Sequence, residues 1–315
     1  MTGTMAAQIY RFDPSSDTLA PVGAGAQRPL RWAAWSPDGA SCLLAGNRGT
    51  AVRYTRDRFE AVDTNTTRNL RGVAFAPDGQ RALLAGNRGA LLLSERGAVR
   101  ELDSPTTENL RRAAWHPSGE YALVIGNAGT VLRYDAASDA VTPLPGDRAH
   151  TLRALAWRPD GAYALVGAYA SPYAGYPRPH ALYRCDGRYL QALLTSDDED
   201  DFVAVDWHPD GRRALIAGYA FRGAASINKL LVYDGGGFAS QPVESSQALL
   251  GAAWRPGGDE ALLCGEGGAL MRYASDGRVE QLDSGTSDNL VGPFWRPDGG
   301  EALLLRGPGE RVYTV

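Results

Sequence analysis

Apolar residues in this chain come in short runs separated by tight turns, and one stretch without insertions shows the pattern most clearly. Its apolar runs are Leu70–Phe75, Arg81–Ala85, Ala90–Ser94 and Ala98–Asp103. The turns between them read Ala76-Pro77-Asp78-Gly79, Gly86-Asn87-Arg88-Gly89 and Glu95-Arg96-Gly97. Proline pre-sets the first turn and glycine supplies its positive φ. Four strands of about five residues joined in this way predict one four-stranded antiparallel blade.

The same pattern recurs through the chain, and its marker is an aromatic residue followed by a Pro-Asp-Gly-like turn. The aromatic positions are Trp35, Phe75, Trp115, Trp157, Trp207, Trp254 and Trp295. They are 40, 40, 42, 50, 47 and 41 residues apart. A period near 40 with several short strands per unit is typical of β-propellers. The sequence therefore predicts an all-β, seven-bladed β-propeller that forms a single domain over residues 1–315.

The recurring aromatic residue has two interpretations. Large and small residues recur at fixed heights of the first strand, which lets neighbouring blades pack face to face with the Trp as the large element. Stacking on a ligand is the alternative, and we favour packing. The variable position after the aromatic residue holds His116 and His208 in two repeats, and we expect both to be exposed.

Ring closure has two candidate segments for one place. Ile9–Asp13 aligns with the third strand of the repeat and Thr18–Val22 with the fourth, but residues 310–315 also align with the third strand. We predict that the N-terminal segment completes the blade begun at Leu290, because this ties both ends of the chain into one sheet.

Composition excludes several function classes. The chain has 315 residues and a net charge of −4, and no Lys/Arg stretch is dense enough to follow a phosphate backbone, so nucleic acid is not an expected partner. Cys42, Cys185 and Cys264 show neither a disulfide nor a zinc spacing. Met1–Phe12 lacks the features of a signal peptide, and no apolar run is long enough to cross a membrane. We expect a cytoplasmic bacterial protein without a membrane partner.

Three connections between repeats share one phrase. They read Asp63-Thr64-Asn65-Thr66-Thr67-Arg68-Asn69-Leu70, Asp103-Ser104-Pro105-Thr106-Thr107-Glu108-Asn109-Leu110 and Asp283-Ser284-Gly285-Thr286-Ser287-Asp288-Asn289-Leu290. With turns such as Gly126-Asn127-Ala128-Gly129-Thr130, the phrase resembles the repeats of photosystem II assembly-factor-like propellers. The W-x-P-D-G turn is similar to that of bacterial WD-repeat propellers. This resemblance covers nearly the whole chain and implies a propeller that binds proteins or ligands on one face.

The two longest repeats place extra residues between their second and third strands. Because this connection and the one that leads to the next repeat emerge on the same face, both insertions crown one face of the ring. Loops of this kind carry function on propellers. Their aromatic side chains and hydrogen-bond donors suit recognition, although packing of the loops onto the blades is the alternative. The candidate binding residues are Tyr169, Tyr173, Tyr176, Arg178, His180, Tyr219, Phe221, Arg222, Asn228 and Lys229.

Four arginines form a second candidate site on the same face. Arg31, Arg71, Arg111 and Arg153 each lie four positions before the aromatic residue, whereas the later repeats carry Val203, Leu250 and Val291 there. An arc of arginines at the channel mouth is a candidate anion site. The alternative is that each arginine pairs with a carboxylate of a neighbouring blade or packs its side-chain stem.

Acidic residues and histidines give weaker candidates. The run Asp197, Asp198, Glu199, Asp200 and Asp201 offers oxygen ligands for Ca²⁺ but lacks the spaced pattern of an EF-hand loop, so a solvated acidic loop is the alternative. Asp206 replaces an alanine of the first strand and must find a hydrogen-bond donor if it is buried. Together with His150 and His180, it is a candidate for acid–base chemistry.

Two functions follow from these features. The first is a non-catalytic binding or scaffold propeller that recognises a protein or ligand through the face with the insertions, without a cofactor. The second is an enzyme that acts on a small polar or anionic substrate at the channel mouth of that face.

Overall fold

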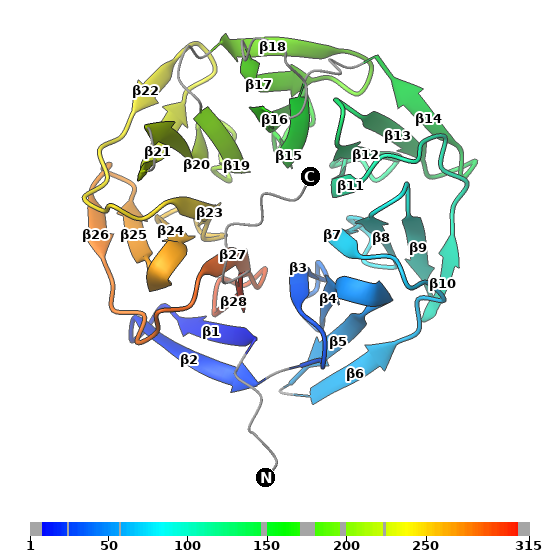
Figure 1. The fold of residues 1–315 in the computed structure, drawn as a ribbon, viewed down its shortest axis with the longest axis horizontal. Coiled ribbons are helices and arrows are strands. Elements are labelled where there is room, and N and C mark those ends of the chain that lie inside the picture. The colour runs from blue at the N-terminus through cyan, green and yellow to red at the C-terminus, as the bar shows by residue number, and fades with distance from the viewer. Residues whose placement is uncertain are drawn as a thin grey trace.

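The computed structural model describes residues 8–23, 25–56, 58–145, 150–170, 180–195, 200–222 and 225–307. Seven four-stranded antiparallel sheets surround a central axis as the blades of a propeller (Figure 1). The all-β, seven-bladed prediction is confirmed. No helix within the described ranges is long and apolar enough to span a membrane.

Six blades are built from consecutive strands, which we name a to d from the innermost outward. Blade 1 consists of β3 (Leu30–Trp35), β4 (Cys42–Gly46), β5 (Ala51–Thr55) and β6 (Arg58–Val62). Blade 2 consists of β7 (Leu70–Phe75), β8 (Arg81–Gly86), β9 (Leu91–Glu95) and β10 (Ala98–Glu101). Blade 3 consists of β11 (Leu110–Trp115), β12 (Tyr121–Gly126), β13 (Val131–Asp135) and β14 (Val141–Leu144). Blade 4 consists of β15 (His150–Trp157), β16 (Ala164–Ala170), β17 (His180–Cys185) and β18 (Leu190–Thr195). Blade 5 consists of β19 (Asp200–Trp207), β20 (Ala214–Arg222), β21 (Ala225–Tyr233) and β22 (Phe238–Ser240). Blade 6 consists of β23 (Leu249–Trp254), β24 (Glu260–Gly265), β25 (Leu270–Ala274) and β26 (Val279–Gln281). Two short 3-10 turns, η1 (Asn47–Gly49) and η2 (Glu266–Gly268), connect strands b and c of blades 1 and 6.

Blade 7 joins both ends of the described chain. β27 (Leu290–Trp295) and β28 (Ala302–Arg306) supply strands a and b, and β1 (Ile9–Asp13) and β2 (Thr18–Gly23) supply c and d. The predicted closure by the N-terminal segment is confirmed. Residues 310–315, the competing candidate, lie outside the described residues.

The recurring tryptophan makes a polar contact between blades in addition to its packing. In four blades the indole Nε1 donates a hydrogen bond to a carbonyl oxygen of the preceding blade, at 3.1 to 3.2 Å. The pairs are Trp35 with Phe294, Trp115 with Ala74, Trp157 with Ala114, and Trp295 with Ala253. The Nε1 atoms of Trp207 and Trp254 are buried and have no partner among the described residues. The signature residue therefore fixes the blade interfaces by packing and, at four of them, by a directed hydrogen bond.

The position after the aromatic residue links one blade to the next on the opposite side of the ring from the b–c connections. Its side chain bonds to the glycine carbonyl of the following W-x-P-D-G turn, at 2.9 to 3.2 Å. The pairs are His116 with Gly161, Arg158 with Gly211, His208 with Gly258, Arg255 with Gly299, and Arg296 with Gly39. The expectation that His116 and His208 are exposed was wrong, because each is partly buried against the tryptophan of the next blade.

Candidate functional site

We call the side of the ring with the b–c turns and the d–a connections the crown face. Its loops are bonded to one another around the ring. The b–c turns of blades 1 and 2 donate from the amides of Gly49 and Gly89 to the carbonyl oxygens of Arg68 and Glu108 in the d–a connections, both at 2.8 Å. The phrase shared by these connections also contributes a side chain, since Asn69 Oδ1 accepts the Arg48 amide at 2.9 Å. The crown face of these blades is thus a bonded rim.

A repeated β-bulge positions the four predicted arginines on this face. The register between strands a and b shifts around the residue four positions before the aromatic residue in blades 1 to 4, at Leu30/Trp32, Leu70/Gly72, Leu110/Arg112 and Leu152/Ala154. A bulge leaves one residue out of the ladder and re-aims its side chain. The residue left out is Arg31, Arg71, Arg111 and Arg153, respectively, which we call the arginine arc.

Asparagines of the b–c turns orient three members of the arc in the same way. The Nε of each arginine donates to the Oδ1 of an asparagine sixteen residues later: Arg31 to Asn47 at 3.0 Å, Arg71 to Asn87 at 3.0 Å, and Arg111 to Asn127 at 2.8 Å. In blade 4 the position of the asparagine holds Tyr169. The guanidinium of Arg153 lies over this ring, 4.8 Å from its centroid, and Nη1 is 3.4 Å from the hydroxyl.

The arc carries positive charge without a carboxylate partner in the part of the chain that the structure describes. The alternative of inter-blade ion pairs is not observed there, because every described ion pair involves other basic residues. Burial, followed by repulsion from other members of the arc, lowers the pKa of Arg71 to about 10 and that of Arg111 to about 10. The lowered pKa values reflect first the burial of these guanidinium groups and second the gathering of like charges.

Sequence reasoning missed a fifth arginine beside the arc. The guanidinium of Arg112 lies 3.4 Å from the centroid of the Trp32 ring, and its Nη1 donates to the carbonyl oxygens of Arg71 and Arg111 at 2.7 and 2.8 Å. The equivalent residue of the blade between them is Gly72, where a Cβ would lie 3.0 Å from Arg112 Cα. The signal was a departure from the repeat, since blade 2 and blades 4 to 7 have alanine or glycine at this position and blade 1 has Trp32.

The crown-face ends of the innermost strands surround the central axis, and we call this position the mouth. Blades 5 and 6 carry acidic and phenolic groups there. Lys229 Nζ lies 3.1 Å from Asp200 Oδ1. Asp201 is buried, and burial followed by the Asp201 charge raises the pKa of Tyr219. Glu266 occupies the place in blade 6 that the asparagines hold in blades 1 to 3. The mouth is therefore positive on blades 1 to 4 and acidic on blades 5 and 6.

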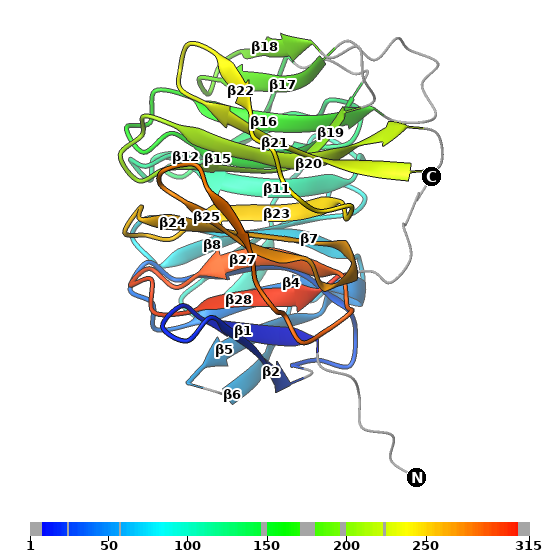
Figure 2. The same ribbon diagram turned by 90° about the vertical axis from the view of Figure 1, so that its left-hand side faces the viewer.

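The insertion of repeat five is ordered as strand and not as the loop expected from sequence. β20 and β21 have nine residues each, and their hairpin extends beyond the other blades on the crown face (Figure 2). Its base is held by the Lys229–Asp200 pair and by a hydrogen bond from Asn228 Nδ2 to the Ser245 carbonyl. Phe221 and Arg222 belong to β20. Ile227 near the tip is 39% exposed.

The predicted catalytic residues are dispersed. His150 is 2% exposed, and its Nδ1 lies 3.0 Å from the Tyr183 hydroxyl. Asp206 corresponds to Ala156, six residues further along strand a than His150, which is about 20 Å at the rise of a strand. The structure therefore does not bring His150 and Asp206 together. His180 begins β17, on the other side of β16 from the strand of His150.

The predicted acidic run and part of the predicted binding loop are only partly covered by the described residues. Asp200 and Asp201 belong to β19 and not to a loop. The described residues contain no group of three or more His, Cys, Asp or Glu placed to hold a metal ion. The remaining candidates, Tyr173, Tyr176, Arg178, Asp197, Asp198 and Glu199, lie outside the described residues.

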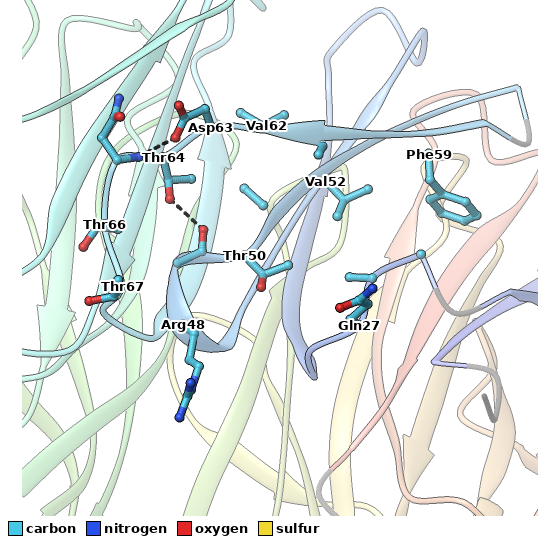
Figure 3. Close-up of a pocket in the computed structure, with 16 residues that line it drawn as sticks. Gln27, Arg48, Thr50, Val52, Phe59, Val62, Asp63, Thr64, Thr66 and Thr67 are labelled. Atoms are coloured by element: carbon cyan, nitrogen blue, oxygen red, sulfur yellow. Dashed lines mark hydrogen bonds between the residues drawn. The ribbon is translucent and has the colours of Figure 1, made fainter. Parts of the chain in front are cut away.

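A hollow of about 650 Å³ lies apart from the arc, on the outer part of blade 1 (Figure 3). Val52, Phe59 and Val62 supply its apolar lining, and Gln27 and Thr66 contribute polar groups. The Thr64 hydroxyl on its border is occupied by a hydrogen bond to the Gly49 carbonyl at 2.6 Å. None of the predicted site residues lines this hollow.

Comparison with known proteins supports the fold alone. No known protein family and no curated protein matches this sequence. The chain is similar in structure to the β-propeller domain of Cps50 (Swd1) from Myceliophteria thermophila, with 13% identity, a TM-score of 0.65, and coverage of 88% of this chain and 96% of that one. It is also similar to a chain of hydrazine synthase from Kuenenia stuttgartiensis, with 14% identity, a TM-score of 0.70, and coverage of 98% and 99%. Identities this low carry no functional conclusion.

Proposed function

We propose that this seven-bladed propeller is a non-catalytic binding module that engages a protein partner through its crown face. The observation that carries the proposal is the β20–β21 hairpin, which extends beyond the face and holds Ile227 in an exposed position. A hairpin fixed at its base loses little conformational freedom on binding, so its exposed apolar residue is a suitable anchor. The resemblance of the repeats to assembly-factor-like propellers agrees with such a role.

The enzyme hypothesis has less support. It requires His150, His180 and Asp206 to converge, and His150 and Asp206 lie at different heights of strand a in blades 4 and 5. His150 is also buried against Tyr183. A general acid or base must come within hydrogen-bond reach of the reacting group, and this pair offers no common location.

The chain offers a matched pair of residues for the test. Among the described residues, Tyr189 and Ile227 are the two exposed large apolar side chains, at 66% and 39%. Tyr189 lies at the end of the c–d turn of blade 4, on the side of the ring opposite the crown face. Substitution of either residue by aspartate leaves the packed core untouched.

The experiment begins with a partner recovered on the immobilised protein and purified. Its affinity is then measured by calorimetry for the wild type, Ile227→Asp and Tyr189→Asp. We expect Ile227→Asp to weaken binding about tenfold or more and Tyr189→Asp to change it less than about twofold. Weakened binding by Tyr189→Asp with unchanged binding by Ile227→Asp would contradict the proposed face.

A further inference from the structure

We propose that the arginine arc binds a small, multiply charged oxyanion at the mouth, on the crown face around the central axis. This site is separate from the hairpin contact and does not depend on the proposed function. Three properties of Arg31, Arg71, Arg111 and Arg153 support this site: their charge, their orientation and their surroundings.

The charge of the arc is not compensated by the described residues. Four arginines project from consecutive blades, and within the described ranges none of them forms an ion pair with a carboxylate. Arg111 is buried, and the other three members are partly buried. Like charges that lose water without gaining a counter-charge destabilise a fold. An anion that contacts several members removes this cost and is bound for that reason.

The hydrogen-bond donors of the arc are already oriented. In Arg31, Arg71 and Arg111 the hydrogen bond to asparagine uses Nε, and their Nη groups make no hydrogen bond with the described residues. The guanidinium fork of each arginine is thus fixed while its outer donors stay available. Arginine forks with this freedom match the oxygen atoms of phosphate and carboxylate groups. Little side-chain entropy is lost on binding because the asparagines have already fixed the stems.

The charges around the arc also favour an anion at this position. Arg112 adds a fifth positive charge next to the arc and is held in place by Trp32 and two carbonyl oxygens. Asp201 and Glu266 lie across the mouth on blades 5 and 6. This division of charge draws an anion toward blades 1 to 4 and disfavours its binding elsewhere on the mouth. Since the arginines come from separate blades, an anion with two or more charged groups can contact more of them than a monovalent one.

The test is calorimetric titration of the full chain with inorganic phosphate, pyrophosphate and citrate at constant ionic strength. We expect pyrophosphate or citrate to bind more tightly than phosphate, and the comparison of the two identifies phosphate or carboxylate as the preferred group. Affinity should fall as NaCl is raised, because the arc acts through charge. Absence of binding by all three anions would overturn the proposal.

The variant Arg71→Gln/Arg111→Gln removes two charges from the arc. We expect its affinity to fall about tenfold to a hundredfold, since each lost charge-assisted contact contributes strongly. Arg71→Lys/Arg111→Lys keeps the charge but not the fork, and we expect an intermediate loss. The control is Arg278→Gln. Arg278 lies in a c–d turn on the opposite side of the ring, and its side chain is 82% exposed. Equal losses in the control and the double variant would show that net charge alone is responsible.

Two further readouts keep the test decisive. If the double variant does not fold, the wild-type protein decides, because a bound anion raises its unfolding temperature with increasing anion concentration and NaCl suppresses this rise. β28 ends at Arg306 on the crown face, so the chain also needs testing as a variant that ends at Gly307. Binding by this shortened chain and none by the full chain would mean that residues 308–315 supply the anion, and the proposal of an external ligand would be wrong.

Discussion

The carboxylate of Asp206 accepts a hydrogen bond from the backbone amide of Trp254 in the next blade, at 2.7 Å. Five other blades have alanine at this position of strand a. The two interfaces formed by this blade are also those whose indoles, in Trp207 and Trp254, lack an acceptor among the described residues. Asp206 therefore replaces the usual contact between blades with one that depends on its protonation state.

The buried carboxyl group of Asp206 should make the protein less stable as pH rises. Burial raises the pKa of Asp206 from its model-compound value to about 7, so the folded state binds more protons than the unfolded state between about pH 4 and pH 7. The stability associated with this group is present at low pH and is lost as pH rises through 7. Asp206→Ala restores the repeat residue and removes this loss. We expect its stability advantage over the wild type to grow by about 1 to 3 kcal/mol between pH 5 and pH 8.

Urea denaturation at the two pH values measures this difference. Asp206→Asn is the matched control, since it keeps the size of the side chain without a titratable proton. A stability difference between Asp206→Ala and the wild type that stays constant from pH 5 to pH 8 would rule out the raised pKa as its cause.

The indole hydrogen bond predicts unequal effects of one substitution at two tryptophans. Trp115→Phe removes a donor that is bonded to the Ala74 carbonyl, whereas Trp207→Phe removes a donor without a partner in the described structure. We expect Trp115→Phe to cost about 1 kcal/mol more in the free energy of unfolding. Chemical denaturation of both variants measures this, and equal costs would show that packing alone determines the role of the residue.

The hydrogen bond between successive W-x-P-D-G turns predicts that alanine destabilises the protein more at Gly161 than at Gly79. Gly161 and Gly79 have φ values of +74° and +70°, so alanine is strained at both. A Cβ at Gly161 would also lie 2.4 Å from His116 Nε2, whereas at Gly79 the nearest atom would be Pro37 Cδ at 3.4 Å. We expect Gly161→Ala to lower the unfolding free energy by about 1 kcal/mol more than Gly79→Ala, because His116 must give up its bond to the Gly161 carbonyl. In a His116→Ala background the difference should disappear.

Closure by the N-terminal strands makes an early residue part of the core. Phe12 is 2% exposed and packs edge-to-face against Trp295, with ring centroids 6.1 Å apart. We expect Phe12→Ala to destabilise the protein by about 3 to 5 kcal/mol. Thr18→Ala, an exposed change in the same blade, should cost less than about 0.5 kcal/mol. Thermal unfolding compares them, and similar midpoints for both variants would mean that blade 7 closes without this strand.

Repetition made the fold predictable from sequence. Seven copies of one aromatic-turn signature predict seven blades, and each copy predicts its own strands because the turn residues dictate local backbone geometry. The strand bounds predicted for repeat two differ from the structure by at most two residues at any end. The location of the arginine arc followed from the same alignment, since equivalent positions of a repeat lie at equivalent heights of the ring.

Side-chain contacts between blades were not predictable in this way. The sequence shows that arginines recur four positions before the aromatic residue, but not that a bulge re-aims them or that asparagines of the b–c turns hold their Nε atoms. It placed His116 in solvent, whereas the next blade covers it. It grouped His150 with Asp206, although the register of blades 4 and 5 separates them along strand a.

The sequence by itself determined what depends on neighbouring residues: the strands, the tight turns, the number of blades and the equivalence of the four arginines. The tertiary structure decided what depends on contacts between distant residues, within a blade or between neighbouring blades. It set the direction of each guanidinium, the stacking of Arg112 on Trp32 across Gly72, and the height at which each titratable group lies. The physical reason is that local backbone preferences act within a few residues, whereas these contacts join positions sixteen or more residues apart, and those between blades join positions about one whole repeat or more apart.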